Sequence, residues 1–399
     1  MHSNPIPSVH MLPAHTPHAP SLIRRRTWLQ AAACGAASAA GLPVWAQDAG
    51  SVVRLGQSIA LTGPLGDLGQ AMHQGARACF EAVNARGGVQ GRKIDLVTQD
   101  DGYDVKRAVA NVDGFMANSD IFGLFNCMGT PMVEAMLPQV TASGIPFIAP
   151  FTGALLARTK ARNVFNVRAS YPDEAEQLVQ HLATIGIKRI GIAYQNNTFG
   201  KEVFDGARLA MERRGLGDGG VVTVESSGAD AATAATKLLA ANPEAVLLGL
   251  AGKPTVDFVK AMRQQRKGMP LYALSIMGSA ATLQALGDDA VGIAVSQVVP
   301  LPTGTGVAVV RDFLQAWKQA DVKLEPSHLA LEGYINARVL VEALRRTGPQ
   351  LTRATLLDAL WSLKRLDLGG FEVNATEPGR NASRFIELTM VGRGGRFIR

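Results

Sequence analysis

Residues 54–104, RLGQSIALTGPLGDLGQAMHQGARACFEAVNARGGVQGRKIDLVTQDDGYD, decide the fold of this chain. An apolar run opens the stretch, a glycine-punctuated turn follows it, and a helix-like segment then leads through a second glycine turn to another apolar run. This order is typical of strand, turn, helix, turn and strand. The stretch therefore predicts one βαβ unit.

The remaining sequence repeats this alternation of strands and helices. Ile121–Cys127 is a continuous apolar run that precedes a helical segment from Pro131 to Ser143, and the pattern restarts at Arg189–Gln195. Strands that are apolar throughout, alternating with amphipathic helices, indicate parallel sheets covered on both faces. Because 399 residues exceed one ordinary hydrophobic core, we predict an α/β protein of two doubly wound parallel-sheet lobes, with a boundary near residues 168–170.

Composition excludes several classes of protein. Hydrophobic residues make up 47% of the chain and charged residues 18%, which argues against disorder. No run of about 18 apolar residues follows residue 50, so we expect no membrane span in the mature chain. Without the three arginines of residues 1–46, 37 of the 40 basic residues remain against 33 acidic residues, a net charge of +4. This excess is scattered, so we expect no nucleic-acid binding.

Residues 1–46 have the features of an export signal. The segment RRRTWLQ at residues 24–30 resembles the twin-arginine motif, and an alanine-rich run follows it. Val44-Trp45-Ala46 offers a small-residue cleavage site that leaves Gln47 as the mature start. A disordered basic tail is the alternative, and Cys34 leaves lipidation open.

The glycine loop at residues 63–69, GPLGDLG, does not match a nucleotide-binding loop. Its spacing is G-x-x-G-x-x-G and not G-x-G-x-x-G, so the second glycine is misplaced for a pyrophosphate. No G-x-S-x-G, P-loop or H-E-x-x-H motif occurs. We therefore predict no catalytic residue, no cofactor and no metal site, and we expect that the chain is not an enzyme. A secreted Rossmann-like enzyme is the weaker alternative.

Two loops carry a hydroxyl between a predicted strand and a helix start. They are Cys127–Pro131, which contains Thr130, and Pro150–Ala154, which contains Phe151 and Thr152. A helix start presents free N–H groups and the positive end of a dipole, which suits an anion. Ligands of open α/β sheets bind at the carboxyl ends of strands, where both loops lie. Thr130 can instead serve only as a helix cap, and the second loop can be ordinary packing.

Three pieces of residues 54–104 resemble the opening of periplasmic solute-binding proteins of the branched-chain amino acid type. They are Thr62-Gly63-Pro64, NARGGVQGR at residues 84–92, and Asp100-Asp101. The resemblance implies the type I periplasmic binding protein fold, in which a three-strand hinge joins two lobes. It places residues 51–168 plus 300–367 in lobe 1 and residues 169–299 plus 368–399 in lobe 2.

The resemblance also implies a function and its partners. The chain would be the periplasmic substrate-binding component of an ABC importer, a monomer that captures a small carboxylate-containing solute and delivers it to a membrane permease. A ligand-sensing periplasmic receptor of the same fold is the alternative. The ligand-binding residues carried over from the family all lie at the ends of predicted strands or in the loops that follow them; they are Leu68, Met128, Gly129, Thr130, Phe151, Thr152, Tyr194, Phe199, Ala251, Ser275 and Met277. Tyr194 fits the cleft or the core equally well.

The sequence departs from the family pattern where an amino-acid ligand needs a partner for its ammonium group. Such binders carry an acidic residue in the loop that corresponds to Ser275–Gly278, and here there is none. An unpaired buried ammonium is costly. Aliphatic or aromatic acids thus join branched-chain and other amino acids as candidate ligands. Another carboxylate, such as Asp67 or Glu202, could still replace the missing partner. Asp100-Asp101 is expected to fix a turn and not to bind a metal.

Two cysteines remain after the signal, Cys79 and Cys127. An oxidising periplasm permits a disulfide. Cys79 stands on the first predicted helix and Cys127 at the end of a strand, so we predict two buried free thiols.

Overall fold

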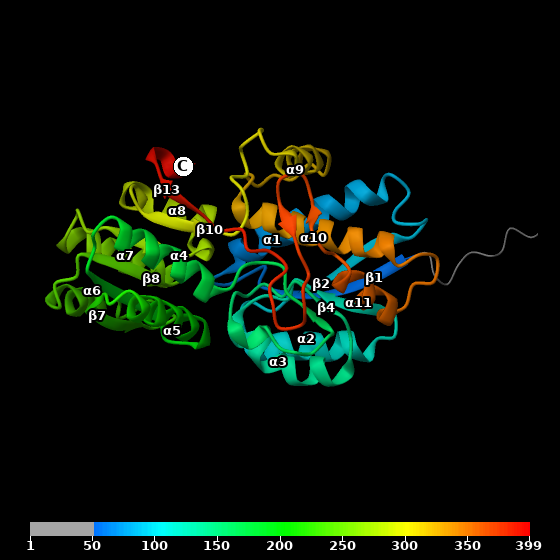
Figure 1. Ribbon diagram of the computed structural model, residues 1–399, viewed down its shortest axis with the longest axis horizontal. Coiled ribbons are helices and arrows are strands. Elements are labelled where there is room, and N and C mark those ends of the chain that lie inside the picture. The colour runs from blue at the N-terminus through cyan, green and yellow to red at the C-terminus, as the bar shows by residue number, and fades with distance from the viewer. Residues whose placement is uncertain (1–51) are drawn as a thin grey trace, which may run out of the picture. The chain divides into compact units, whose positions relative to one another are not determined.

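The computed structural model describes residues 52–399 (Figure 1). The predicted export signal, its cleavage site at Ala46 and Cys34 lie outside these residues. Within residues 52–399 no helix combines the length and the apolar character needed to cross a membrane.

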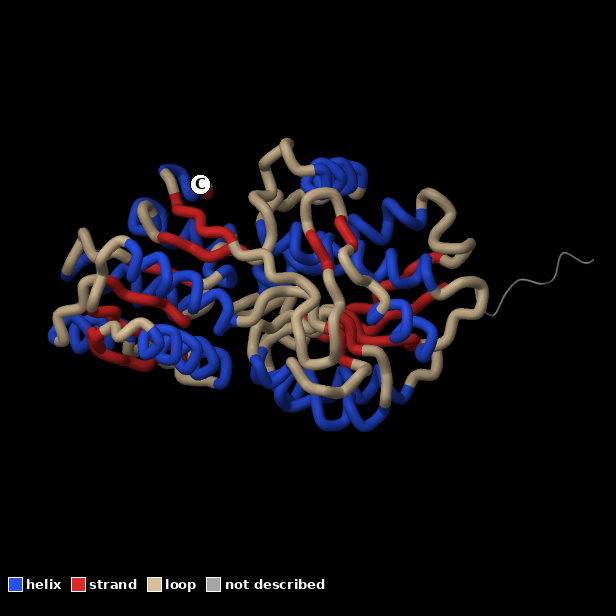
Figure 2. The backbone as a smooth tube through the Cα atoms, in the orientation of Figure 1, coloured by secondary structure: helices blue, strands red, loops and turns tan. Residues whose placement is uncertain are grey.

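The first sheet is parallel throughout, in the order β2-β1-β3-β4-β5. Its strands are β1 (Val52–Ile59), β2 (Lys93–Asp100), β3 (Ile121–Phe125), β4 (Phe147–Ile148) and β5 (Val164–Phe165). Three helices connect them: α1 (Gly66–Asn84), α2 (Val105–Ala117) and α3 (Thr130–Ser143). One hydrophobic cluster joins α1 to one face of the sheet, and another joins α2 and α3 to the opposite face (Figure 2). The predicted βαβ unit and the doubly wound first lobe are confirmed.

The second sheet repeats that order and then extends it. Its order is β14-β13-β10-β9-β8-β6-β7. The strands are β6 (Arg189–Gln195), β7 (Gly217–Val224), β8 (Ala245–Gly249), β9 (Leu271–Ala273), β10 (Ala294–Gln297), β13 (Glu387–Val391) and β14 (Phe397–Ile398). Its helices are α4 (Tyr171–Thr184), α5 (Thr198–Arg213), α6 (Ala231–Ala240), α7 (Lys253–Gln265) and α8 (Ala280–Leu286). The pairs β10–β13 and β13–β14 are antiparallel, so this sheet is parallel only through its first five strands.

Three helices that follow the second lobe's strands pack back on the first lobe. They are α9 (Ala308–Gln319), α10 (His328–Arg346) and α11 (Arg353–Trp361), and they share one hydrophobic cluster with α1. Helices α1 and α10 approach closely because each has a glycine at the contact. A Cβ on Gly75 would lie 1.8 Å from Ala330 O, and one on Gly333 would lie 2.0 Å from Met72 O. Any larger residue at either position would push these two helices apart.

Residues 368–382 also pack with the first lobe, whereas the resemblance assigned residues 368–399 to the second. A hairpin of β11 (Leu366–Asp367) and β12 (Glu372–Val373) begins this segment. Ala375 N donates to Leu363 O at 2.8 Å, and Ala382 N donates to Asn166 O at 2.9 Å. The return to the second sheet therefore takes place between Ala382 and β13. The apolar residues Leu368, Phe371 and Val373 explain this difference, because the cluster around α9 to α11 buries them.

The two cysteines are free and buried, as predicted. Burial raises the pKa of both thiols to about 12. Both therefore stay protonated and unreactive at neutral pH.

Candidate functional site

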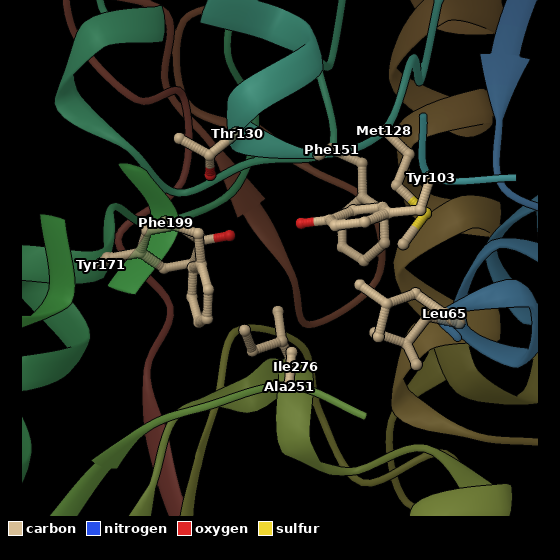
Figure 3. A pocket seen from close by; sticks show the side chains of 11 residues that line it. Leu65, Tyr103, Met128, Thr130, Phe151, Tyr171, Phe199, Ala251 and Ile276 are labelled. Carbon is tan, nitrogen blue, oxygen red and sulfur yellow. The ribbon is translucent and has the colours of Figure 1, made fainter. Parts of the chain in front are cut away.

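A pocket lies where the carboxyl ends of the strands of both sheets meet, as expected for open α/β sheets (Figure 3). The first lobe contributes Leu65, Leu68, Tyr103, Met128, Gly129, Thr130 and Phe151. The second lobe contributes Tyr171, Phe199, Ala251 and Ile276. Both lobes are therefore required to form the site.

Two loops of the first lobe hold the polar end of the pocket. Phe151 N donates to Cys127 O at 2.9 Å, and Gly129 N donates to Phe151 O at 3.1 Å, so the loops are tied together like two short strands. The hydroxyls of Thr130 and Thr152 are hydrogen-bonded at 2.8 Å, and Thr152 Oγ1 also accepts from Ala154 N at 3.1 Å. Both side chains are buried.

Helix α3 begins at this pair without a side-chain cap. Its N-cap residue is Gly129, and no side chain bonds the first turn. The Thr130 hydroxyl bonds to Thr152 and does not cap the helix. The start of α3 therefore keeps free N–H groups and a positive dipole end beside the pocket, an arrangement that suits an anion.

Tyr103 reaches the pocket from a turn that Asp100 and Asp101 hold in place. Asp101 accepts from Tyr103 N at 2.9 Å and from Ser58 Oγ at 2.8 Å. Asp100 accepts from Thr62 Oγ1 at 2.6 Å and from Leu61 N at 2.8 Å, and these bonds hold its pKa well below its usual range. Tyr103 has φ +63°, a conformation that a tyrosine rarely adopts. The acidic pair thus serves as a turn clamp, in agreement with the prediction.

Three hydroxyl groups point into the pocket, from Thr130, Tyr103 and Tyr171 (Figure 3). The other lining residues are apolar or glycine, and none of the lining residues is charged. Tyr171 packs edge-on against Phe199, with ring centroids 5.2 Å apart. The site therefore combines apolar walls with neutral hydrogen-bonding groups.

The cleft is closed around this pocket. The space open to the centre of a water molecule is about 20 Å³, enough for about one water. Gly252 has φ +61°, and a Cβ at this position would lie 2.5 Å from Leu65 Cδ2 and 2.9 Å from Pro64 O. The loop after β8 in the second lobe thus touches the loop after β1 in the first.

A buried charge network lies behind the aromatic wall. The guanidinium carbon of Arg168 is 5.7 Å from the centre of the Phe151 ring and 5.5 Å from that of Tyr171. Arg168 Nη2 donates to Glu174 Oε1 at 2.9 Å, and Nη1 lies 3.5 Å from Glu332 Oε1. These three side chains are almost fully buried. Because Glu332 is on α10 and Glu174 is on α4, the network joins the two lobes.

Seven of the eleven predicted ligand residues line the pocket: Leu68, Met128, Gly129, Thr130, Phe151, Phe199 and Ala251. Thr152 lies directly behind Thr130. The other three point elsewhere. Tyr194 stacks on Phe204, Ser275 donates from N and Oγ to Glu174, and Met277 is buried in the second lobe's core. Ligand contact by any of the eleven stays a prediction.

Four lining residues did not emerge from the sequence: Leu65, Tyr103, Tyr171 and Ile276. Tyr171 opens α4, whose capping box from Ser170 to Asp173 gives a clear helix-start signal. Ile276 is the middle residue of the short 3₁₀ helix η2 (Ser275–Met277). The search for ligand residues at strand ends therefore identified the right loop. Within that loop it selected Ser275 and Met277, whereas Ile276 between them lines the pocket.

Neither alternative carboxylate lines the pocket. Glu202 accepts from Leu155 N at 3.0 Å and from Leu156 N at 3.2 Å, so its oxygens are engaged between α5 and the 3₁₀ helix η1 (Leu155–Ala157). Asp67 is on the first turn of α1, outside the lining set. Among residues 52–399 no group of three His, Cys, Asp or Glu side chains is placed to hold a metal ion.

The chain is similar to known proteins in both sequence and fold. Residues 52–396 match the model of a family described as periplasmic binding protein. A substrate-binding periplasmic protein from Ralstonia solanacearum is 32% identical, with a TM-score of 0.80 over 87% of this chain and 99% of that chain. A possible leucine/isoleucine/valine-binding protein from Rhodopirellula baltica is 28% identical, with a TM-score of 0.82 over 88% and 96%. A Leu/Ile/Val-binding protein homolog 7 from Brucella abortus is 24% identical over 78% of this chain and 81% of its own length.

Proposed function

Because the chain belongs to the periplasmic binding protein family, we propose that it is the solute-binding component of an ABC importer. It captures a small carboxylate-bearing solute between its lobes and presents the closed form to a membrane permease. Lobe closure by hinge motion is the movement that such a two-lobe fold allows. The chain works as an exported monomer in the periplasm, with the signal removed near Ala46.

The observation that carries this proposal is the uncharged pocket at the start of α3. Thr130 and the free N–H groups of the first turn can bind a carboxylate. Tyr103 and Tyr171 supply two further hydroxyls that point into the same space (Figure 3). Several hydrogen bonds to a carboxylate stabilise its charged form even without a cationic side chain.

The same pocket offers no counter-charge to an ammonium group. No carboxylate lines it, and an unpaired ammonium there would pay a large desolvation cost. The remaining walls are apolar, with Phe151, Phe199 and Ile276 among them. We therefore propose an aliphatic or aromatic acid without an α-amino group as the ligand.

A thermal-shift screen with aliphatic acids, aromatic acids and amino acids tests this proposal. A ligand that binds only the folded state stabilises it by about 2.7 kcal/mol at a concentration of 100 Kd. We expect plain acids to raise the melting temperature and their α-amino counterparts to have little effect. Stabilisation by leucine or valine, with none by plain acids, would contradict the proposed ligand class.

Replacing Thr130 with valine is expected to weaken binding of the acid identified in that screen by about ten- to 100-fold. The substitution keeps the shape of the side chain and removes a donor to a charged group, which is worth roughly 1.5–3 kcal/mol. Isothermal titration calorimetry gives the affinity. Thr389→Val is the matched control, because it removes a buried hydroxyl on β13 that bonds to Val295 O at 3.1 Å and does not line the pocket. Equal affinities of the two variants would refute the role of Thr130.

A further inference from the structure

A second cavity lies on the first lobe, between α1, α9 and α10. Its volume is about 390 Å³, and it shares no lining residue with the pocket in the cleft. Three of its lining residues are arginines, Arg86, Arg338 and Arg345. We call it the arginine cavity.

Two helices bring these guanidinium groups together. Arg86 follows the C-terminus of α1, and Arg338 and Arg345 are seven residues apart on α10, a spacing of two turns that places them on one face. Arg338 is held in place: Nη1 donates to Tyr334 OH at 3.2 Å and to Asp312 Oδ2 at 3.1 Å. Its side chain is only 21% exposed. At least one guanidinium is therefore fixed before any ligand arrives.

The lining of the cavity carries an excess of positive charge. Three arginines face one carboxylate, that of Asp312, which gives a formal balance of +2. Arg345 also pairs with Glu342, which is not a lining residue. Among the ion pairs of residues 52–399, none involves Arg86. The guanidinium group of Arg86 thus keeps its donors available for a ligand.

The charges of the three arginines all act on one buried group, the thiol of Cys79. Burial raises the pKa of the Cys79 thiol to about 12, and the charges of Arg338, Arg86 and Arg345 all oppose that rise. Cys79 is on α1, one turn before the lining residue Val83. Because all three arginines line the same cavity, a single small ligand can contact more than one of them.

We propose that the arginine cavity binds a small dianion, a phosphate or a dicarboxylate. The guanidinium group presents a planar fork of N–H donors that matches both kinds of oxyanion. The volume falls within the range of small-molecule sites. The Asp312 carboxylate repels any anion, but the remaining positive excess attracts a doubly charged ligand more strongly than a monoanion. This site is independent of the carboxylate site in the cleft.

Isothermal titration calorimetry with inorganic phosphate, with succinate and with the monoanion acetate tests this inference at low ionic strength. We expect saturable binding of phosphate or succinate that is tighter than binding of acetate. The double variant Arg86→Gln, Arg345→Gln should bind the dianion at least about tenfold more weakly, because it loses two charge-assisted contacts. Arg346→Gln is the matched control: Arg346 is next to Arg345 on α10, but it donates to Ser362 O at 3.0 Å and does not line the cavity.

A variant that should bind the dianion more tightly than the wild type provides a second test. Asp312→Asn raises the formal balance of the lining to +3 and should tighten dianion binding by at least about fivefold, the effect of one unit charge on one ligand charge near 4 Å in water. Thr130→Val, in the cleft, should leave dianion binding unchanged. The inference is overturned if neither dianion binds saturably, if the double variant binds like the Arg346→Gln control, or if Thr130→Val abolishes dianion binding.

Discussion

Replacing Arg168 with methionine is expected to lower the free energy of unfolding at pH 7 by about 3–5 kcal/mol, the cost of breaking a buried ion pair from one side. Arg168 is the cation in contact with the buried carboxylates of both Glu174 and Glu332. Methionine fills part of the space but leaves two carboxylates without a counter-charge. Urea denaturation of the wild type and the variant measures the difference.

An exposed pair supplies the control for this prediction. Arg162 pairs with Asp358, and their side chains are 53% and 65% exposed. Arg162→Met should therefore cost only about 0–1 kcal/mol. If the two methionine variants lose equal stability, the buried network does not stabilise the fold.

The pH dependence of the Arg168→Met loss follows from Glu332. Burial raises the pKa of its carboxyl above the usual value, and Arg168 partly offsets that rise. A raised pKa gives a contribution to stability that is full at low pH and is lost as the pH rises through the folded-state pKa. Removing Arg168 raises this pKa further, so the deficit should be larger at pH 7 than at pH 4.5. Glu332→Gln in the Arg168→Met background should recover part of the loss.

Replacing Gly252 with alanine is expected to weaken ligand binding by roughly five- to 150-fold. The added Cβ would lie 2.5 Å from Leu65 Cδ2 and 2.9 Å from Pro64 O, atoms of the opposite lobe. Overlap of this kind costs about 1–3 kcal/mol, and the open form escapes the cost because its lobes are apart. Calorimetry with the acid found in the screen measures the affinity, and small-angle X-ray scattering measures whether the ligand still compacts the protein.

The Gly287→Ala variant separates the effect of overlap with the first lobe from the effect of backbone strain. Gly287 has φ +55°, close to the +61° of Gly252, but nothing lies within 4 Å of a Cβ at that position. Both variants should lose similar stability without ligand, and only Gly252→Ala should lose affinity. Identical affinities would show that the contact with Leu65 does not limit closure.

Most of the fold could be predicted because its signals are local. Apolar strands, glycine turns and helix starts repeat along residues 52–297, and each lobe follows the same strand order. The return of residues 368–382 to the first lobe could not be predicted from such signals. It depends on where Phe371 and Val373 find an apolar surface, and that surface is built by helices far away in the chain.

The sequence predicts which loops form the site, but it does not predict which residues of those loops line the pocket. Thr130 and Phe151 follow strands whose ends are evident, and both line the pocket. Tyr103 lies three residues after a strand and reaches the pocket only because its backbone has a positive φ. In η2, Ile276 lines the pocket while Ser275 and Met277 turn away, and no periodicity in three residues reveals which one points inward.

The order in which the chain contributes segments to its two lobes also constrains how the protein folds during synthesis. Helices α9 to α11 of the first lobe come after β10 of the second, and β13 pairs with β10 across about 90 residues of intervening sequence. The first lobe therefore cannot be finished before residues 308–382 leave the ribosome, and the second cannot be finished before residues 387–398 do. Until these last strands emerge, the edge of β10 that pairs with β13 stays unpaired and exposed. A chain that has been synthesised only as far as β10 consequently has no complete lobe with which to bind ligand.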